Sequence, residues 1–228
     1  HADSLGAAGR YGHGDVQWMT AGKGVQHSEM FPLLNQEQGN PLLLFQLWLN
    51  LPAKSKMVEP HFAMFWAQDL PVVNTADEEG NAIKVEVTAG EYQGVKALAP
   101  PPASWAADPA NGVAVWVIDL APHANWQLPA AQPGLNRTLY FFEGRSLQLA
   151  GNTIAARHSM KLDSHKEVSI KNSEVPARLL LLQGKPIGEP VAHHGPFVMN
   201  TRSELMQAFA DYQQSQFGGW PWPDADQV

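Results

Sequence analysis

The sequence predicts an all-β protein made of two β-rich units and one C-terminal helix, and three observations lead to this fold class. Proline and glycine are both frequent, with 18 and 19 residues, which favours short strands joined by turns. Short apolar segments recur with turn residues between them, which is typical of an antiparallel sandwich or barrel. A helical spacing of apolar residues behind a capping box occurs only near the C-terminus.

The composition excludes several classes of protein. Of the 228 residues, 44% are hydrophobic and 16% are charged, and the formal net charge is −7. Such a chain lacks the basic surface that nucleic-acid binding requires, and no run of lysine and arginine would hold it to an anionic membrane. The longest apolar stretch, Leu42–Leu51, is too short for a membrane span of about 20 residues. We therefore expect no nucleic-acid partner and no membrane association.

The absence of cysteine bears on the compartment. Without cysteine the chain has no disulfides and no thiolate metal sites, which fits a reducing environment. No signal peptide is recognisable, so we expect a cytoplasmic protein. The chain begins with His1 instead of methionine, and we expect that it starts inside the natural sequence.

The first β-rich unit is expected over residues 1–98. A turn at Gly12–Asp15 opens into the first strand. Four apolar or alternating segments are its expected strands: Val16–Met19, Leu42–Leu51, His61–Trp66 and Ile83–Thr88. Leu42–Leu51 has the pattern of a buried strand, and Ile83–Thr88 alternates with the period of two of a half-buried one. A jelly-roll barrel has about eight strands, so this unit is predicted to be incomplete.

Residues 99–110 are rich in proline and predict a stiff, extended connector. The second β-rich unit is expected over residues 111–200. Its predicted strands follow one another at short intervals: Val113–Leu120, Thr138–Phe142, Ser146–Leu149, Thr153–Ala156, Glu167–Ile170 and Ala177–Gln183.

Residues 201–228 predict a helix and a tail. Thr201 and Glu204 have the spacing of a capping box. The apolar residues that share one helical face are Leu205, Ala208, Phe209 and Tyr212. Gly218 and Gly219 are expected to end the helix, whose apolar stripe should pack on a barrel.

His27 and Glu29 are the candidate metal ligands. Residues i and i+2 of a strand point to the same side, so both side chains should project together into a barrel interior. An imidazole with a carboxylate suits iron, manganese, nickel, copper or zinc. By spacing alone, a surface histidine and a surface glutamate that share a strand edge are the more frequent arrangement, since H-x-E is common. His1 and His13 lie in or beside turns and are expected to be solvated, whereas His61 is expected to be packed.

Three long segments resemble the pirin family. GDVQWMTAGKGVQHSEM, residues 14–30, is similar to the second cupin motif in its pirin form, and FQLWLNLPAKSKMVEP, residues 45–60, resembles the segment that follows it. HHGPFVMNT, residues 193–201, resembles the C-terminal signature of the family, and the opening HADSLGAAG also fits. These matches run in order along nearly the whole chain, which makes them more specific than any single motif.

The resemblance implies two stacked cupin (jelly-roll) β-barrels with a C-terminal helix, the C-terminal barrel without metal ligands. It also implies one divalent transition metal, usually iron, held by the histidines of an H-x-H segment and by the H-x-E pair. Carried over, that pair falls on His27 and Glu29. No H-x-H occurs in the 228 residues. Two further histidine ligands are therefore expected upstream of His1, and weak or absent metal binding is expected of this chain.

The activity that the resemblance implies is that of a quercetin 2,3-dioxygenase, a metal-dependent oxidoreductase that opens the heterocyclic ring of a flavonol with dioxygen. Glu29 would be the general base that takes the proton of the flavonol hydroxyl. The alternative is a non-catalytic regulatory protein that binds a transcription factor or metabolic enzyme through a metal-dependent surface. A third possibility is a processed form without activity. The family resemblance indicates a monomer.

Overall fold

The computed structural model describes residues 1–223, so the end of the predicted tail, residues 224–228, lies outside the described part. The chain packs into two compact units. The first unit holds His1–Trp66, Pro101–Trp105 and the chain from Ile187 onwards, and the second holds Ala67–Pro100 and Ala106–Pro186. The domain boundaries drawn from the sequence, after residues 98, 110 and 200, stay a prediction.

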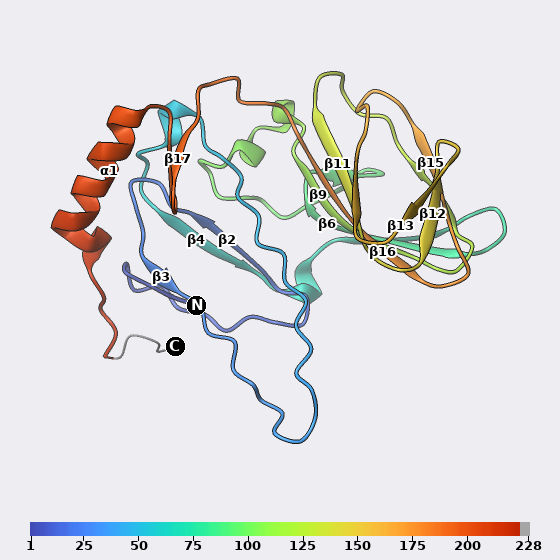
Figure 1. The fold of residues 1–228 in the computed structure, drawn as a ribbon, viewed down its shortest axis with the longest axis horizontal. Helices are drawn as coiled ribbons and strands as arrows, with labels where there is room; N and C mark the ends of the chain where they lie inside the picture. Colours follow the sequence, from blue (N-terminus) through green and yellow to red (C-terminus); the bar gives the residue numbers. More distant parts are fainter. Residues whose placement is uncertain (224–228) are drawn as a thin grey trace. The chain divides into compact units, whose positions relative to one another are not determined.

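Two antiparallel sheets build the second unit (Figure 1). The larger sheet has the order β14 (His158–Lys161), β11 (Asn136–Glu143), β16 (Ala177–Gly184), β9 (Ala114–Leu120), β6 (Ala82–Ala89) and β5 (Val72–Ala76). The smaller sheet has the order β10 (Asn125–Leu128), β15 (Val168–Asn172), β12 (Ser146–Leu149) and β13 (Asn152–Ala155). A short hairpin, β7 (Glu91–Tyr92) with β8 (Val95–Lys96), follows β6.

The core of the second unit is built by alternate residues of these strands. Along β9, which confirms the predicted strand at Val113–Leu120, every second side chain is buried. Four completely buried register partners cross the larger sheet in a row: Phe141, Leu179, Ile118 and Val85. Burying one such side chain stabilises the fold by about 1.5–3 kcal/mol, so this row is a main source of the stability of the unit.

The strands of the first unit pair two by two within the described residues. The pairs are β1 (Ala2–Asp3) with β3 (His27–Ser28), β2 (Val16–Thr20) with β4 (His61–Phe65), and β17 (Ala192–His194) with β18 (Phe197–Met199). The predicted strand at 16–19 is confirmed as β2, and the aromatic segment at 61–66 as β4.

The predicted buried strand at Leu42–Leu51 is wrong. Residues 31–52 contain no strand, and the large apolar side chains between Leu42 and Leu49 are exposed. A strand needs a neighbour that pairs with its backbone groups, and none of the described strands pairs with this segment. The segment is therefore apolar in sequence but exposed in the structure.

The predicted extended connector at 99–110 is also corrected. Asp108 accepts a hydrogen bond from the Ala110 N–H and caps a short 3-10 turn, Pro109–Asn111, which Gly112 ends with a left-handed φ of 55°. Further 3-10 turns occur at Ala53–Ser55, Ala67–Asp69, Trp105–Ala107 and Gln216–Gly218.

The predicted C-terminal helix is confirmed as α1 (Arg202–Ser215), with both halves of the capping box of Thr201 and Glu204 present. It ends at Ser215, before Gly218, because Gln216 takes the left-handed conformation with a φ of 47°. Its aromatic side packs on the β17–β18 hairpin, where the rings of Phe197 and Phe209 lie 4.6 Å apart. In the described part of the chain, no helix is long and apolar enough to cross a membrane.

Candidate metal centre

The pairing of β1 with β3 creates the candidate site. Asp3 lies opposite His27, and Ala2 lies opposite Ser28. If this register is continued by one residue, His1 faces Glu29. The side chains of residues that face each other across antiparallel strands come close, so the pairing gathers His1, His27 and Glu29 at one place.

A glycine-containing loop leads into β3. Gly24 has a φ of +130°, and a Cβ atom at this position would lie 2.5 Å from the ring of Phe217. Only glycine fits there, because the left-handed conformation and the close ring both exclude a side chain. The loop before His27 is thus packed directly against the C-terminal segment of the same unit.

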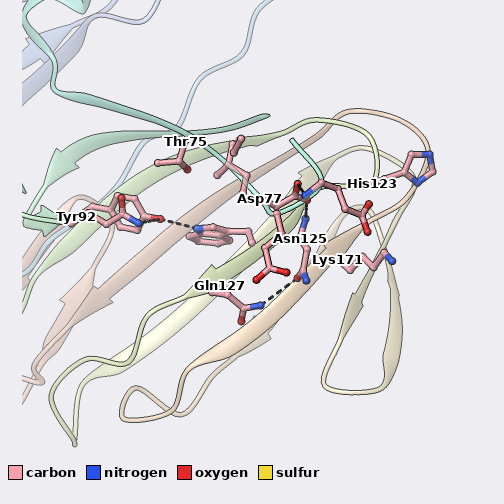
Figure 2. Close-up of a pocket in the computed structure, with 13 residues that line it drawn as sticks. Thr75, Asp77, Tyr92, His123, Asn125, Gln127 and Lys171 are labelled. Carbon is pink, nitrogen blue, oxygen red and sulfur yellow. Dashed lines mark hydrogen bonds between the residues drawn. The ribbon is translucent and has the colours of Figure 1, made fainter. Parts of the chain in front are cut away.

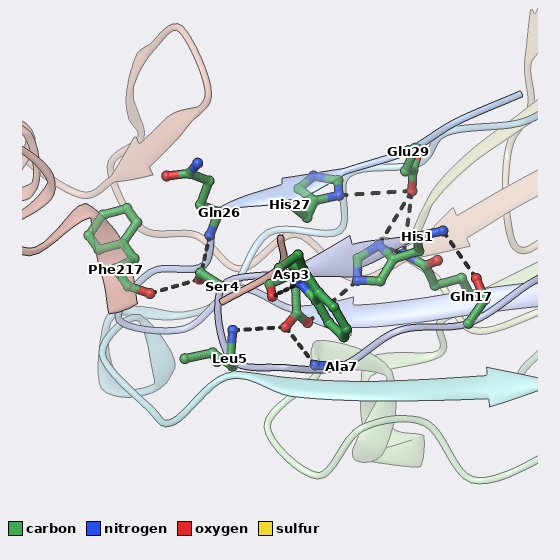
Figure 3. A network of polar contacts seen from close by, with 12 residues as sticks. His1, Asp3, Ser4, Leu5, Ala7, Gln17, Gln26, His27, Glu29 and Phe217 are labelled. Atoms are coloured by element: carbon green, nitrogen blue, oxygen red, sulfur yellow. Dashed lines mark hydrogen bonds and ion pairs between the residues drawn. The ribbon is translucent and has the colours of Figure 1, made fainter. Parts of the chain in front are cut away.

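His27 and Glu29 approach each other as the sequence predicts (Figure 3). Their Nδ1 and Oε1 atoms are 3.9 Å apart, and His1 Nδ1 lies at the same distance from Glu29 Oε1. One donor atom from each of the three side chains lies within 4.8 Å of the others. Two atoms that bind one ion, each at about 2.1 Å, lie at most about 4.2 Å apart. The chemistry and spacing of His27 and Glu29 therefore fit part of a metal site.

The three side chains differ in exposure. The His1 side chain is completely buried, Glu29 is 20% exposed and His27 is 32% exposed. The described residues of this unit therefore enclose His27 only in part, and the projection of His27 and Glu29 into a barrel interior stays a prediction.

The solvation expected for His1 is wrong. Its ring stacks on Phe62 with the centroids 4.7 Å apart and an angle of 19°. The sequence holds one signal that points to this role, the acidic Asp3 two residues further on, since alternate residues of a strand share a side. His13 is exposed, as predicted, whereas the packing expected for His61 is wrong, since it is exposed at the start of β4.

Two more residues that the motif search missed contact Glu29. Gln17 of β2 donates from Nε2 to Glu29 Oε1 at 3.4 Å. The Tyr11 hydroxyl hydrogen-bonds to Glu29, and burial together with the charge and hydrogen bond of this carboxylate raises the pKa of Tyr11 to about 12. The phenol therefore stays protonated at neutral pH and acts as a donor.

The C-terminal segment contacts the strand that carries His1. Trp222 donates from Nε1 to the Asp3 carbonyl at 2.8 Å, and the Ser4 hydroxyl donates to the Phe217 carbonyl at 2.7 Å. Ser4 Oγ also accepts from the Gln26 N–H at 3.1 Å. These hydrogen bonds fasten the start of the chain, the loop before His27 and the C-terminal segment together.

A cleft of about 480 Å³ lies in the second unit and contains none of the predicted site residues (Figure 2). Asp77, His123 and Lys171 are among its lining residues. On its apolar side, Trp126 Nε1 donates to the Tyr92 hydroxyl at 3.0 Å. The buried side-chain atoms without a partner in the described residues belong to Gln17, Trp116 and Asn200, which do not line this cleft.

Comparison with known proteins links the chain to one family. The family model for pirin matches residues 1–49, and the model for the pirin C-terminal cupin domain matches residues 115–218. A pirin-like protein of Solanum lycopersicum is 37% identical over 223 residues, which cover 96% of this chain and 69% of the relative. A pirin-like protein of Caulobacter vibrioides is 38% identical over 221 residues, which cover 95% and 72%.

A solved structure shows the same likeness. The crystal structure of quercetin 2,3-dioxygenase from Acinetobacter baumannii aligns with a TM-score of 0.74 at 28% identity. The alignment covers 95% of this chain and 71% of that protein, so it includes both units.

Proposed function

The chain belongs to the pirin family, and we propose that it acts as a quercetin 2,3-dioxygenase, opening a flavonol ring at a single metal ion held in part by His27 and Glu29. The observation that carries the proposal is the 3.9 Å approach of His27 Nδ1 to Glu29 Oε1. The likeness to the Acinetobacter baumannii enzyme supports it.

The proposed ligand set consists of His27, Glu29 and two further histidines in the intact protein. Imidazole nitrogens with one carboxylate suit iron, which we propose as the natural metal. A bound iron ion would supply Lewis acidity and redox chemistry toward an enolic oxygen and dioxygen. The 228 residues contain no H-x-H segment, so weak metal binding by this chain alone is part of the proposal.

Glu29 is the proposed general base. Its carboxylate would take the proton of the flavonol hydroxyl and return it to the product. Gln17 and Tyr11 both donate to this carboxylate, and their hydrogen bonds hold it in one orientation.

Replacement of the proposed base tests the function. Glu29→Gln in the iron-loaded natural full-length protein keeps the shape of the side chain and removes its basicity. We expect the rate of quercetin bleaching and of oxygen consumption to fall about 10²- to 10⁴-fold, the usual contribution of general base catalysis.

The matched control is Glu59→Gln. Glu59 lies in the same unit, is exposed and pairs with Lys23 at the surface. This variant should bleach quercetin at the wild-type rate. No turnover by the wild-type protein with stoichiometric iron would contradict the proposed activity.

The second candidate function is a regulatory protein that binds a protein partner, and the exposed apolar segment favours it. Met30, Phe31, Leu33, Leu34 and the apolar residues between Leu42 and Leu49 are exposed, and exposed apolar patches often mark interaction sites. Under this hypothesis, a transcription factor or metabolic enzyme should stay bound in pull-downs of Glu29→Gln. Loss of the partner in Leu43→Ser but not in Glu29→Gln would favour this function over catalysis.

A further inference from the structure

A continuous chain of polar contacts runs from the buried Asp3 to the carboxylate of Glu29 (Figure 3). It begins at the Asp3 carboxylate, whose Oδ1 accepts from the backbone N–H groups of Leu5 and Ala7, both at 2.9 Å. Asp3 is 3% exposed. A buried carboxylate held by backbone donors cannot swing away, so it is a rigid anchor.

The next member of the chain is His1. Its Nε2 lies 3.4 Å from Asp3 Oδ2, and its Nδ1 lies 3.1 Å from Gln17 Nε2. The stack on Phe62 holds the plane of the ring. Both ring nitrogens of His1 therefore have a partner.

Gln17 decides which ring nitrogen carries the proton. The Glu29 carboxylate only accepts hydrogen bonds, so the amide nitrogen of Gln17 must face it, with the Nε2–Oε1 distance at 3.4 Å. The second hydrogen of the same Nε2 then points to His1 Nδ1, which must accept. A neutral imidazole that accepts at Nδ1 carries its proton at Nε2, where it faces Asp3 Oδ2.

This assignment separates His1 from the ligands. The lone pair of Nδ1 is used by Gln17, and Nε2 bears a proton directed at Asp3. Although a ring nitrogen of His1 lies within 4.8 Å of the donor atoms of His27 and Glu29, neither of its nitrogens is free for an ion. Residues that support metal ligands in this way orient them and tune their affinity.

We propose that Asp3, His1 and Gln17 form a positioning chain that orients the Glu29 carboxylate, with His1 held as the Nε2–H tautomer and outside the metal ligand set. The function of this positioning chain rests on the proposed role of Glu29 as ligand and general base. The contacts that define the positioning chain do not depend on that role.

The tautomer of His1 gives a direct test. Long-range ¹⁵N–¹H correlation spectra of the ¹⁵N-labelled, metal-free protein at neutral pH should show His1 as a neutral ring with the proton on Nε2. The signals are assigned by their disappearance in His1→Phe. A proton on Nδ1, or averaging between the two tautomers, would overturn the proposal, whether or not the protein binds metal.

Metal affinity gives the second test, with Co²⁺ as the probe in competition with a chelator. Asp3→Asn and Gln17→Leu in the natural full-length protein should each weaken Co²⁺ binding by about 10- to 100-fold, the usual effect of losing an outer-shell partner. The control is Asp163→Asn. It alters an exposed Asp–His pair of the same i, i+2 spacing in the second unit, with Asp163 Oδ1 and His165 Nδ1 2.5 Å apart.

The outcomes separate this proposal from the proposed function. Wild-type affinity in both Asp3→Asn and Gln17→Leu would refute the positioning chain and leave the activity standing. Absence of Co²⁺ binding by the wild-type protein would refute the metal-dependent function. The His1 spectrum would still test the positioning chain in that case. If Asp3→Asn does not fold, Gln17→Leu and the wild-type spectrum provide the decision.

Discussion

Asp77 shows how one carboxylate joins separate strands of the second unit. Its Oδ1 accepts from the N–H groups of Glu79 and Asn81 at 3.0 and 2.8 Å. Its Oδ2 accepts from Asn81 Nδ2 at 3.0 Å and from the Asn125 N–H at 2.8 Å. These contacts tie the turn between β5 and β6 to the start of β10. The hydrogen bonds, that from the Asn81 side chain first, lower the pKa of Asp77 to about 2.

This low pKa predicts an acid-dependent loss of stability. Because the pKa of Asp77 is lower in the folded state than its ordinary value of 3.8, its contribution is complete above that value and is lost as the pH falls through about 2. Asp77→Asn should be less stable than the wild type at pH 5. Its melting temperature should fall less than that of the wild type between pH 5 and pH 2. Thermal unfolding followed by circular dichroism measures both effects.

The neighbouring Glu78→Gln serves as the control, since Glu78 is exposed in the same turn. It should keep the pH dependence of the wild type. The same pH dependence in Asp77→Asn and the wild type would show that other carboxylates cause the loss of stability at low pH.

At the scale of the element, the sequence predicts the capping box of α1, and the structure contains both of its hydrogen bonds. The Glu204 N–H donates to Thr201 Oγ1 at 3.2 Å, and the Thr201 N–H donates to Glu204 Oε2 at 2.7 Å. These hydrogen bonds, the Thr201 side chain first, lower the pKa of Glu204. They satisfy backbone groups that the first turn of a helix leaves free.

Removal of the cap should destabilise this helix. Thr201→Ala loses the side-chain acceptor and is expected to lower the free energy of unfolding by about 1 kcal/mol. Urea unfolding followed at 222 nm measures the loss. Ser203→Ala is the control, because Ser203 is exposed in the same turn and should change the stability much less. Equal losses in both variants would argue against the cap as the cause.

The exposed segment at 42–49 illustrates the opposite case, in which a strong pattern does not decide an element. Its sequence has the apolar run of a buried strand, but the burial of a strand depends on a partner that the run itself does not specify. β9 has a similar apolar run and lies between β16 and β6, which satisfy its backbone on both sides.

At the scale of the whole molecule, the stability of the second unit depends on the hydrophobic core that its strands build. Ile118 lies in the middle of the buried row, between Leu179 and Val85, and all three are completely buried. Interiors are packed at crystal-like density, so the neighbours of Ile118 can fill a lost volume only in part.

Ile118→Ala is therefore expected to lower the free energy of unfolding by about 2–5 kcal/mol, and Ile118→Val by about 0.5–1.5 kcal/mol. Denaturant unfolding measures both. Val117→Ala is the matched control on the other side of the same strand, where the residue is only half-buried, and its effect should be smaller. A loss at Val117 that equals the loss at Ile118 would contradict the assignment of the buried face.

Local patterns sufficed for the features that depend on neighbours in the chain. Apolar segments and the turn residues between them predicted the strands β2, β6, β9, β11, β12 and β16. Thr201 and Glu204 predicted the start of the helix. The approach of His27 to Glu29 follows from their i, i+2 spacing. The long matched segments identified the family, which the comparisons confirm together with the cupin fold.

The tertiary structure alone decided what surrounds that pair. His1, Asp3, Tyr11 and Gln17 come from separate turns and strands, and no periodicity relates them to Glu29. They meet because β1 pairs with β3 and the side chain of Gln17 reaches across from β2. The spacing along the chain therefore determined the H-x-E pair, whereas the burial of His1 and the donors around Glu29 were set by strand pairing, since long-range contacts determine solvent exposure.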